Sequence, residues 1–191
     1  MSDATERADA EIRFCEAIMA KSGTNVLLET LPDAPDLTAW SHYPEGDVFD
    51  PASGAQYYYH CHSPAGDAEE HGHFHCFVRP EGREGKVHHL AAIGVDPYGK
   101  LLRIFTVNHW VVGDDWLESE ATIPLLTRFD IEMARPSYLV NRWLTAIFVR
   151  YEAEIAELIR QRDLVIASHG AGDPAANRED RTLEVTSEFR P

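Results

Sequence analysis

The amino-acid sequence predicts a single α+β domain: an antiparallel sheet of at least four strands, with an N-terminal helix and a long C-terminal helix packed on one face. Three observations lead to this fold class. Apolar residues recur at helical spacing near both ends of the chain. Between residues 55 and 112 the spacing changes to alternation and short apolar runs, which is typical of strands. The segments between these runs are short and contain Gly or Pro, which favours antiparallel connections.

The first element is a helix predicted over Asp3–Lys21, with an apolar stripe at helical spacing and Gly23 where a C-terminal cap is expected. A short element of undetermined type follows at residues 26–31. The segment from Trp40 to Gly54 is dense in Pro, Gly and Asp, and it predicts a loop. Four strands are then predicted, at residues 56–62, 71–79, 87–95 and 101–112.

The second half of the chain returns to helical spacing. A helix is predicted over residues 116–133, interrupted or restarted near Pro124, and Pro136 suits the first turn of the longest helix, which runs to about residue 167. Residues 1–170 are expected to form one domain, and the polar segment 171–191 to be a mobile or loosely packed tail. The apolar stripe of the longest helix comprises Val140, Trp143, Leu144, Ile147, Phe148, Tyr151, Ile155, Leu158 and Ile159.

Composition limits the function classes. The chain has 17 Lys and Arg against 32 Asp and Glu, for a formal charge of -15. Nucleic acid and anionic membrane surfaces are therefore not expected partners, because phosphate contacts need clustered basic residues. The polar, acidic start predicts no secretory signal, and three cysteines without one indicate free thiols in the cytoplasm. A monomer or small homo-oligomer is expected.

The most distinctive feature is a group of five histidines within 16 residues, where an even spread of all ten would place fewer than one. They alternate with other residues, and a strand sends every second side chain to one face. A hairpin across residues 63–70 would bring His60 beside His73, with Cys61 and Cys76 on the opposite, core face. The five are His60, His62, His71, His73 and His75.

Imidazoles on opposed strands can converge on one ion, because opposed Cβ atoms lie roughly 4.5–5.5 Å apart. The five histidines are therefore candidate metal ligands, and Glu70 (or its neighbour Glu69) can add a carboxylate. This ligand set suits a divalent transition metal (Zn, Fe, Mn or Ni). The protein would then be a metal-binding protein, with an enzyme acting on a small molecule as one form of that function; the catalytic residues stay unassigned.

A plainer interpretation remains open, in which the histidines are hydrated polar groups and the protein binds a small ligand or partner without metal. Other candidates are weaker. Of the adjacent His88 and His89 only one can join the cluster, since they point to opposite faces. His109 is expected at the edge of the core. Gly-rich phosphate loops, nucleophile elbows and HExxH motifs are absent from the sequence.

The segments GAQYYYH (residues 54–60) and EHGHFH (residues 70–75) give the sequence a resemblance to an uncharacterised bacterial family of unknown function. The resemblance extends through Asn108-His109-Trp110 and Arg162-Asp163. It implies a self-contained small bacterial protein and supplies no activity. Cupins also use an HxH pair, but they place a glutamate shortly after it; here Glu70 comes too late after His62, so a cupin is not expected.

Overall fold

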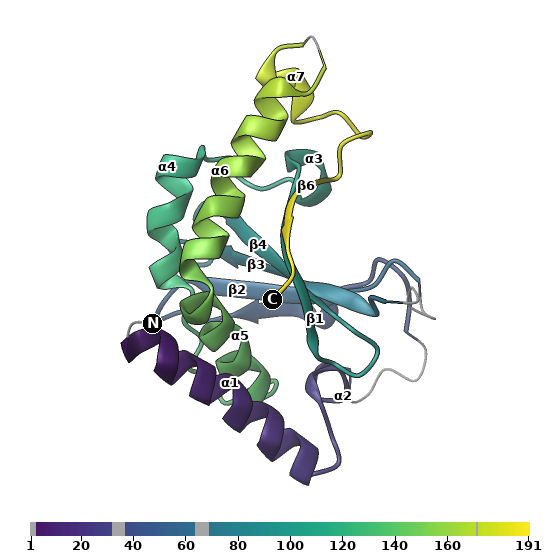
Figure 1. Ribbon diagram of the computed structural model, residues 1–191, viewed down its shortest axis with the longest axis vertical. Helices are drawn as coiled ribbons and strands as arrows, with labels where there is room; N and C mark the ends of the chain where they lie inside the picture. Colours follow the sequence, from purple (N-terminus) through teal and green to yellow (C-terminus); the bar gives the residue numbers. More distant parts are fainter. Residues whose placement is uncertain (1–2, 32–36, 64–68, 171) are drawn as a thin grey trace.

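The computed structural model describes residues 3–31, 37–63, 69–170 and 172–191. It shows the α+β fold that the sequence predicts. One antiparallel sheet has the strand order β1-β2-β3-β4-β5-β6, so that each strand pairs with its neighbours along the chain. Helices α1, α5 and α6 lie over one face of the sheet (Figure 1). The strands are β1 (Tyr43–Phe49), β2 (Ala55–His60), β3 (Gly72–Val78), β4 (His88–Val95), β5 (Leu101–Val107) and β6 (Val185–Phe189).

Helix α1 (Asp3–Lys21) has the predicted bounds, and the short element after it is helix α2 (Val26–Thr30). The α1 side chains Cys15 and Met19 enter the core. Two ion pairs, Arg142 to Glu11 at 2.8 Å and Arg150 to Asp9 at 3.0 Å, join α1 to the helix beside it. The helix therefore docks by an apolar stripe with charged pairs along its borders.

The long C-terminal helix is two helices, α5 (Tyr138–Arg150) and α6 (Glu152–Ser168), which meet at Tyr151. Ser137 caps the start of α5, where its side chain accepts a hydrogen bond from the backbone N–H of Val140. All of the predicted stripe is buried except Tyr151, which is half-buried. The Trp143 ring contacts Phe74 of β3, so the stripe covers the sheet face that carries Cys76.

The segment predicted to be a loop, residues 40–54, contains edge strand β1. Its Val48 pairs with Tyr57 of β2, and Tyr43 pairs with Tyr59, with an irregularity between the two pairs. An edge strand needs only one set of ladder hydrogen bonds and tolerates a bulge, so it can contain proline, glycine and aspartate. These residues made the segment resemble a loop in the sequence. The loop prediction is corrected to a strand between residues 43 and 49.

Two further predicted elements are shorter than expected. The fourth predicted strand ends at Val107, because Asn108 caps the short helix α3 (His109–Val112) with its side chain. The helix predicted over residues 116–133 is reduced to α4 (Ser119–Thr122) and the 3₁₀ helix η1 (Ile123–Arg128). Local apolar spacing predicted both longer elements, and it carries no information about caps that end them early.

The C-terminal segment differs from the expected loose tail. It contains helix α7 (Pro174–Asn177) and strand β6, which pairs along β5 and completes the sheet. The Ser187 hydroxyl also donates to the carbonyl oxygen of Leu158 in α6. A five-residue strand held by backbone hydrogen bonds needs no apolar stripe, which is why composition did not reveal it.

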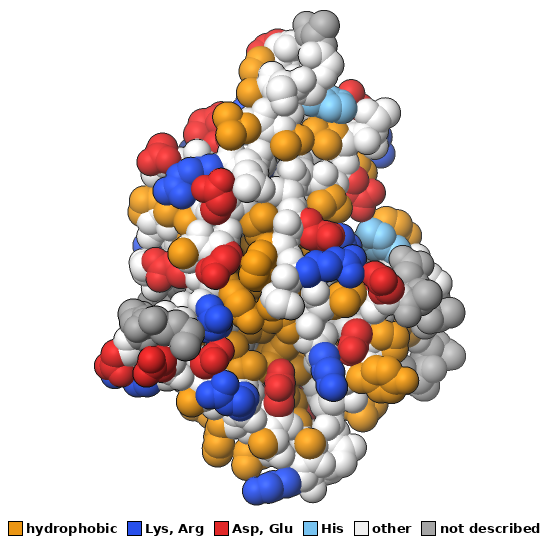
Figure 2. Space-filling model, in the orientation of Figure 1, with side chains coloured by type: hydrophobic (Ala, Val, Ile, Leu, Met, Phe, Trp, Pro, Cys, Tyr) orange, Lys and Arg blue, Asp and Glu red, His pale blue; other side chains and the backbone are white. Residues whose placement is uncertain are grey.

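The surface over the helices carries both signs of charge, interspersed rather than gathered into one patch (Figure 2). In the described part of the chain, no helix has the length and apolar character needed to cross a bilayer.

Candidate metal centre

The two sheet faces differ sharply in chemistry, and the histidines lie on the face opposite the helices. The β2–β3 register pairs His60 with His73 and Tyr58 with His75, as the sequence predicts for a hairpin here. His60, His73 and His75 are all buried. The alternating residues Tyr59, Phe74 and Cys76 belong to the helix-covered core.

Three histidines bring one ring nitrogen each into a common space. The candidate nitrogens of His60, His62 and His73 all lie within 4.8 Å of one another, and they are the one such group of metal-binding side chains among the described residues. His60 and His73 are buried, whereas His62, just past the end of β2, is exposed. The group therefore has a closed inner side and one ligand at the surface.

The closest contact in this group joins the Nε2 atoms of His60 and His73, which lie 2.8 Å apart. Two nitrogens bound tetrahedrally to one ion at about 2.0–2.1 Å would be separated by roughly 3.3 Å. A shift of about half an ångström between the rings would open a ligand position, which is within the reach of small side-chain rotations. The arrangement is thus close to a metal-binding geometry.

Burial keeps the imidazoles of His60 and His73 neutral. Desolvation, followed by the proximity of His73 and His62, lowers the pKa of His60 to about 3. Desolvation also lowers the pKa of His73, against the opposing effect of Glu70. Since a metal binds the neutral form of histidine, these two rings have the charge state that a ligand needs at neutral pH.

Glu70 lies behind His73 rather than among the three nitrogens. Its Oε1 is 2.8 Å from Nδ1 of His73, and its Oε2 is 2.5 Å from Nε of Arg103. Burial opposes ionisation of Glu70, but the hydrogen bonds from His73 and Arg103 outweigh it and lower the pKa to about 2. Glu70 is therefore an ionised acceptor next to the site, in a different place from the metal ligand that the sequence suggests.

His75 is fully buried and extends the cluster inward. Its Nδ1 is 3.1 Å from Nε2 of His89 on β4, and its Nε2 has no hydrogen-bond partner. The ring forms a triangle with those of His60 and His73, with centroids 5.0 and 4.8 Å away. A buried nitrogen without a partner is costly, so it marks a position where a polar ligand would be stabilising.

His71 is not brought into the cluster. It precedes β3, and its Nδ1 is 2.5 Å from the hydroxyl of Tyr59, whose ring belongs to the core face. Gly72 permits this contact, because a Cβ there would meet that hydroxyl at 2.3 Å. Alternation predicted a shared face for His71 and His73, but it holds only within a strand, and His71 lies outside it.

Several residues around the cluster were missed by sequence reasoning. Trp40 stacks on His62 at 4.3 Å, and His42 stacks on Tyr58 at 3.6 Å, so both rings close over the histidine face. Both come from the segment predicted to be a loop, and only the short run Trp-Ser-His-Tyr at residues 40–43 marks them. His89 and Arg103 come from later strands. His89 was an open alternative to His88, and the structure selects it.

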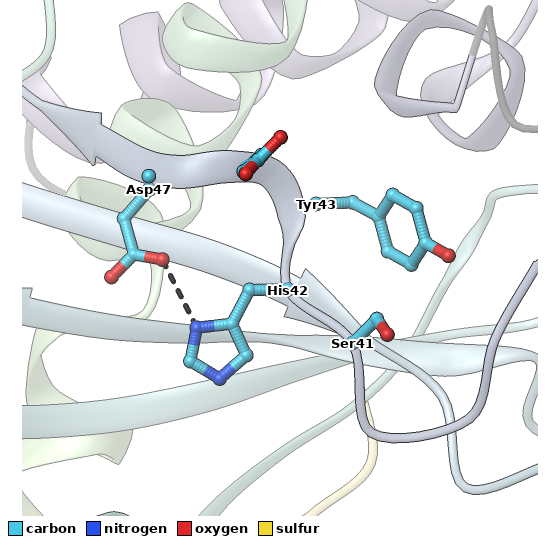
Figure 3. Close-up of a pocket in the computed structure, with 6 residues that line it drawn as sticks. Ser41, His42, Tyr43 and Asp47 are labelled. Carbon is cyan, nitrogen blue, oxygen red and sulfur yellow. Dashed lines mark hydrogen bonds and ion pairs between the residues drawn. The ribbon is translucent and has the colours of Figure 1, made fainter.

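A shallow pocket of about 620 Å³ borders the cluster on the β1 side. In its wall, Oδ1 of Asp47 and Nδ1 of His42 lie 3.1 Å apart, in direct contact (Figure 3). The His42 ring is 6.4 Å from that of His60. A small molecule in this pocket would contact His42, whose ring neighbours that of His60. Its lining comprises Ser41, His42, Tyr43, Glu45, Gly46 and Asp47.

The other sequence candidates are engaged elsewhere. His88 contacts the carbonyl oxygen of Asp115 through Nδ1, and His109 contacts Glu179 and the carbonyl oxygen of Asp114. Cys61 and Cys76 are free, buried thiols, as predicted. They contribute no ligand to the three-nitrogen group.

These features define a class of protein, an α+β domain with a histidine cluster on the sheet face opposite its helices. Residues 6–190 match a family described as a domain of unknown function, DUF6969, and the chain belongs to that family. This agrees with the resemblance to an uncharacterised family seen in the sequence. Comparison with curated proteins and with solved structures gives no match.

Proposed function

We propose that this protein binds one divalent transition metal through His60, His62 and His73. The observation that supports it best is the convergence of three ring nitrogens within 4.8 Å, two of them buried. Burial of two imidazoles in contact costs free energy, and a shared metal ion would offset that cost. Imidazole ligands suit zinc, iron and nickel, and the ligand type alone does not choose among them, whereas manganese prefers oxygen ligands.

A small-molecule enzyme is the form of this function that the site favours. Three protein ligands leave a fourth position open, which is the pattern of catalytic rather than structural zinc sites. His42, which lines the neighbouring pocket, has its ring 6.4 Å from that of the candidate ligand His60. A metal bound there would act as a Lewis acid or lower the pKa of a bound water. His75 is a further candidate ligand, because its Nε2 is buried without a partner.

A second candidate function is binding of a small molecule without metal. The two stacked pairs, Trp40 on His62 and His42 on Tyr58, support it because flat aromatic surfaces at a pocket rim are typical of ligand sites. The histidines would then act as hydrogen-bonding groups. We infer a reducing compartment such as the cytoplasm in either case, since three free, buried thiols suit one.

Metal analysis of the untagged protein separates the two functions. We expect close to one equivalent of a transition metal as purified, or uptake of one equivalent of Zn²⁺ or Co²⁺ by calorimetry. His60→Ala and His73→Ala should abolish uptake, whereas His71→Ala, the matched control on the other face, should retain it. A wild-type protein that neither holds metal nor gains stability from Zn²⁺, Ni²⁺, Mn²⁺ or Fe²⁺ would favour the metal-free function.

A further inference from the structure

The Glu70 carboxylate occupies space that exists only because residue 94 is glycine. Gly94 of β4 pairs with His73 of β3. A Cβ at position 94 would lie 2.7 Å from Oε2 of Glu70 and 2.9 Å from Cγ of Arg103. Non-bonded carbons do not approach that closely, so any larger residue at position 94 must move the carboxylate, the arginine or both.

Arg103 holds the carboxylate from its other side. Besides its bond to Glu70, its Nη1 is 2.6 Å from Oε2 of Glu188 on β6. The guanidinium carbon lies 4.1 Å over the ring of Phe105, which is in edge contact with His73. Glu70 is thus fixed by charge on one side and by backbone on the other, and one oxygen remains for His73.

We propose that Glu70, seated over Gly94 and held by Arg103, is a positioning residue that fixes His73 with its proton on Nδ1 and a free lone pair on Nε2. This inference rests on the proposed metal site, and it states which residue sets the tautomer of one of the ligands. An ionised carboxylate only accepts hydrogen bonds, so Nδ1 of His73 must donate. In the neutral ring Nε2 is then the acceptor, the form that a metal requires.

Gly94→Ala is the sharpest test, because it alters no ligand and no charge. We expect displacement of Glu70 and a zinc affinity lower by about 10- to 100-fold, the usual effect of losing such an outer hydrogen bond. Glu70→Ala should give a similar loss. The double variant should bind no more weakly than Glu70→Ala alone, since both changes remove one interaction. Glu69→Ala, at the exposed neighbouring carboxylate, is the matched control and should bind as wild type.

Two-bond ¹⁵N–¹H correlation of the metal-free protein reads the His73 proton directly. Wild type should carry it on Nδ1, and Gly94→Ala and Glu70→Ala should shift His73 toward the other tautomer. Unchanged zinc affinity together with an unchanged tautomer in both variants overturns the inference. If Gly94→Ala does not fold, Glu70→Ala decides by the same two measurements. If wild type binds no metal, the proposed function fails. The tautomer measurement still tests whether Glu70 sets the position of the His73 proton.

Discussion

The Nε2 atoms of His60 and His73 lie 2.8 Å apart, on directly paired residues of β2 and β3. Both rings are buried, and both have lowered pKa values because desolvation penalises the charged form. In the absence of metal only one of the two nitrogens can carry a proton in this contact. The pair therefore holds two neutral imidazoles together at a distance that a metal would need to widen only slightly.

The stability of the metal-free protein should fall as pH drops below about 6.5, the ordinary pKa of histidine. Desolvation lowers the pKa of His60 and His89 to about 3, and lowers that of His75 as well. The unfolded chain then binds more protons than the folded one, so each histidine reduces the free energy of unfolding by up to about 1.4 kcal/mol per pH unit. Urea unfolding between pH 8 and 5 measures this.

The decline should begin below pH 7 and continue through pH 5, with a nearly flat region above pH 7. The reference pKa values of Asp and Glu, roughly 3.9 and 4.3, lie below this window, so histidines are the groups whose ordinary pKa falls in it. His169→Ala, a change at a half-exposed surface histidine, should leave the slope almost unaltered. A free energy of unfolding that is constant from pH 7 to 5 would contradict the buried, neutral state of the cluster.

The three thiols should be unreactive in the native protein. All are buried, and desolvation raises the pKa of each, to about 11 for Cys15. The thiolate is the reactive form, so a disulfide reagent should label less than one thiol per chain at pH 7.5 and all three after denaturation. Rapid labelling of Cys61 or Cys76 in the native state would show that the sheet is open on the helix side.

Trp143→Ala should lower the free energy of unfolding by about 3–5 kcal/mol, the usual cost of emptying a large core position. The side chain is fully buried and its Nε1 donates to Glu16 of α1 at 3.0 Å, so the substitution removes packing and a link between two helices. Trp40→Ala is the matched control, because Trp40 is 62% exposed and should cost little. Equal effects of the two substitutions would place the stripe outside the core.

Removal of residues 185–191 should lower the melting temperature by more than about 5 °C, because it strips β5 of one of its two partner strands. The hydroxyl of Thr106 would lose its contacts with Thr186 and Ser187. Removal of residues 190 and 191 alone is the control and should matter little, since both are exposed. A shortened chain with an unchanged melting temperature would support the interpretation, suggested by composition, that the C-terminal segment is a loosely packed tail.

The sequence predicted the parts of this molecule that depend on local periodicity. Alternation sufficed to pair His60 with His73 and to send Cys76 to the core, because the strands there are regular. It failed at His71, which lies just outside a strand. It also failed at β1, since an edge strand tolerates the Pro and Gly that predict a loop.

The surroundings of the site come from distant parts of the chain, and no local pattern connects them. Arg103 reaches Glu70 from β5, and Gly94 makes room for the carboxylate from β4. Trp40 reaches His62 from the segment before β1. Such contacts follow from strand order and register, which the histidine motifs alone do not determine.

Trp40 provides a direct optical test of the metal site. Its ring is stacked on His62 at 4.3 Å, so a metal bound to His62 would lie within a few ångströms of an exposed indole. We expect Ni²⁺ or Co²⁺, which quench by contact with open d shells, to reduce tryptophan fluorescence with saturation near one equivalent. Zn²⁺, with a filled d shell, should change it much less. Trp40→Phe keeps a ring on His62 and should remove most of the Ni²⁺ response without weakening Ni²⁺ binding by calorimetry. Full quenching in that variant would show that the metal binds near another tryptophan. Saturating binding without any Trp40-dependent quenching would show that His62 is not a ligand.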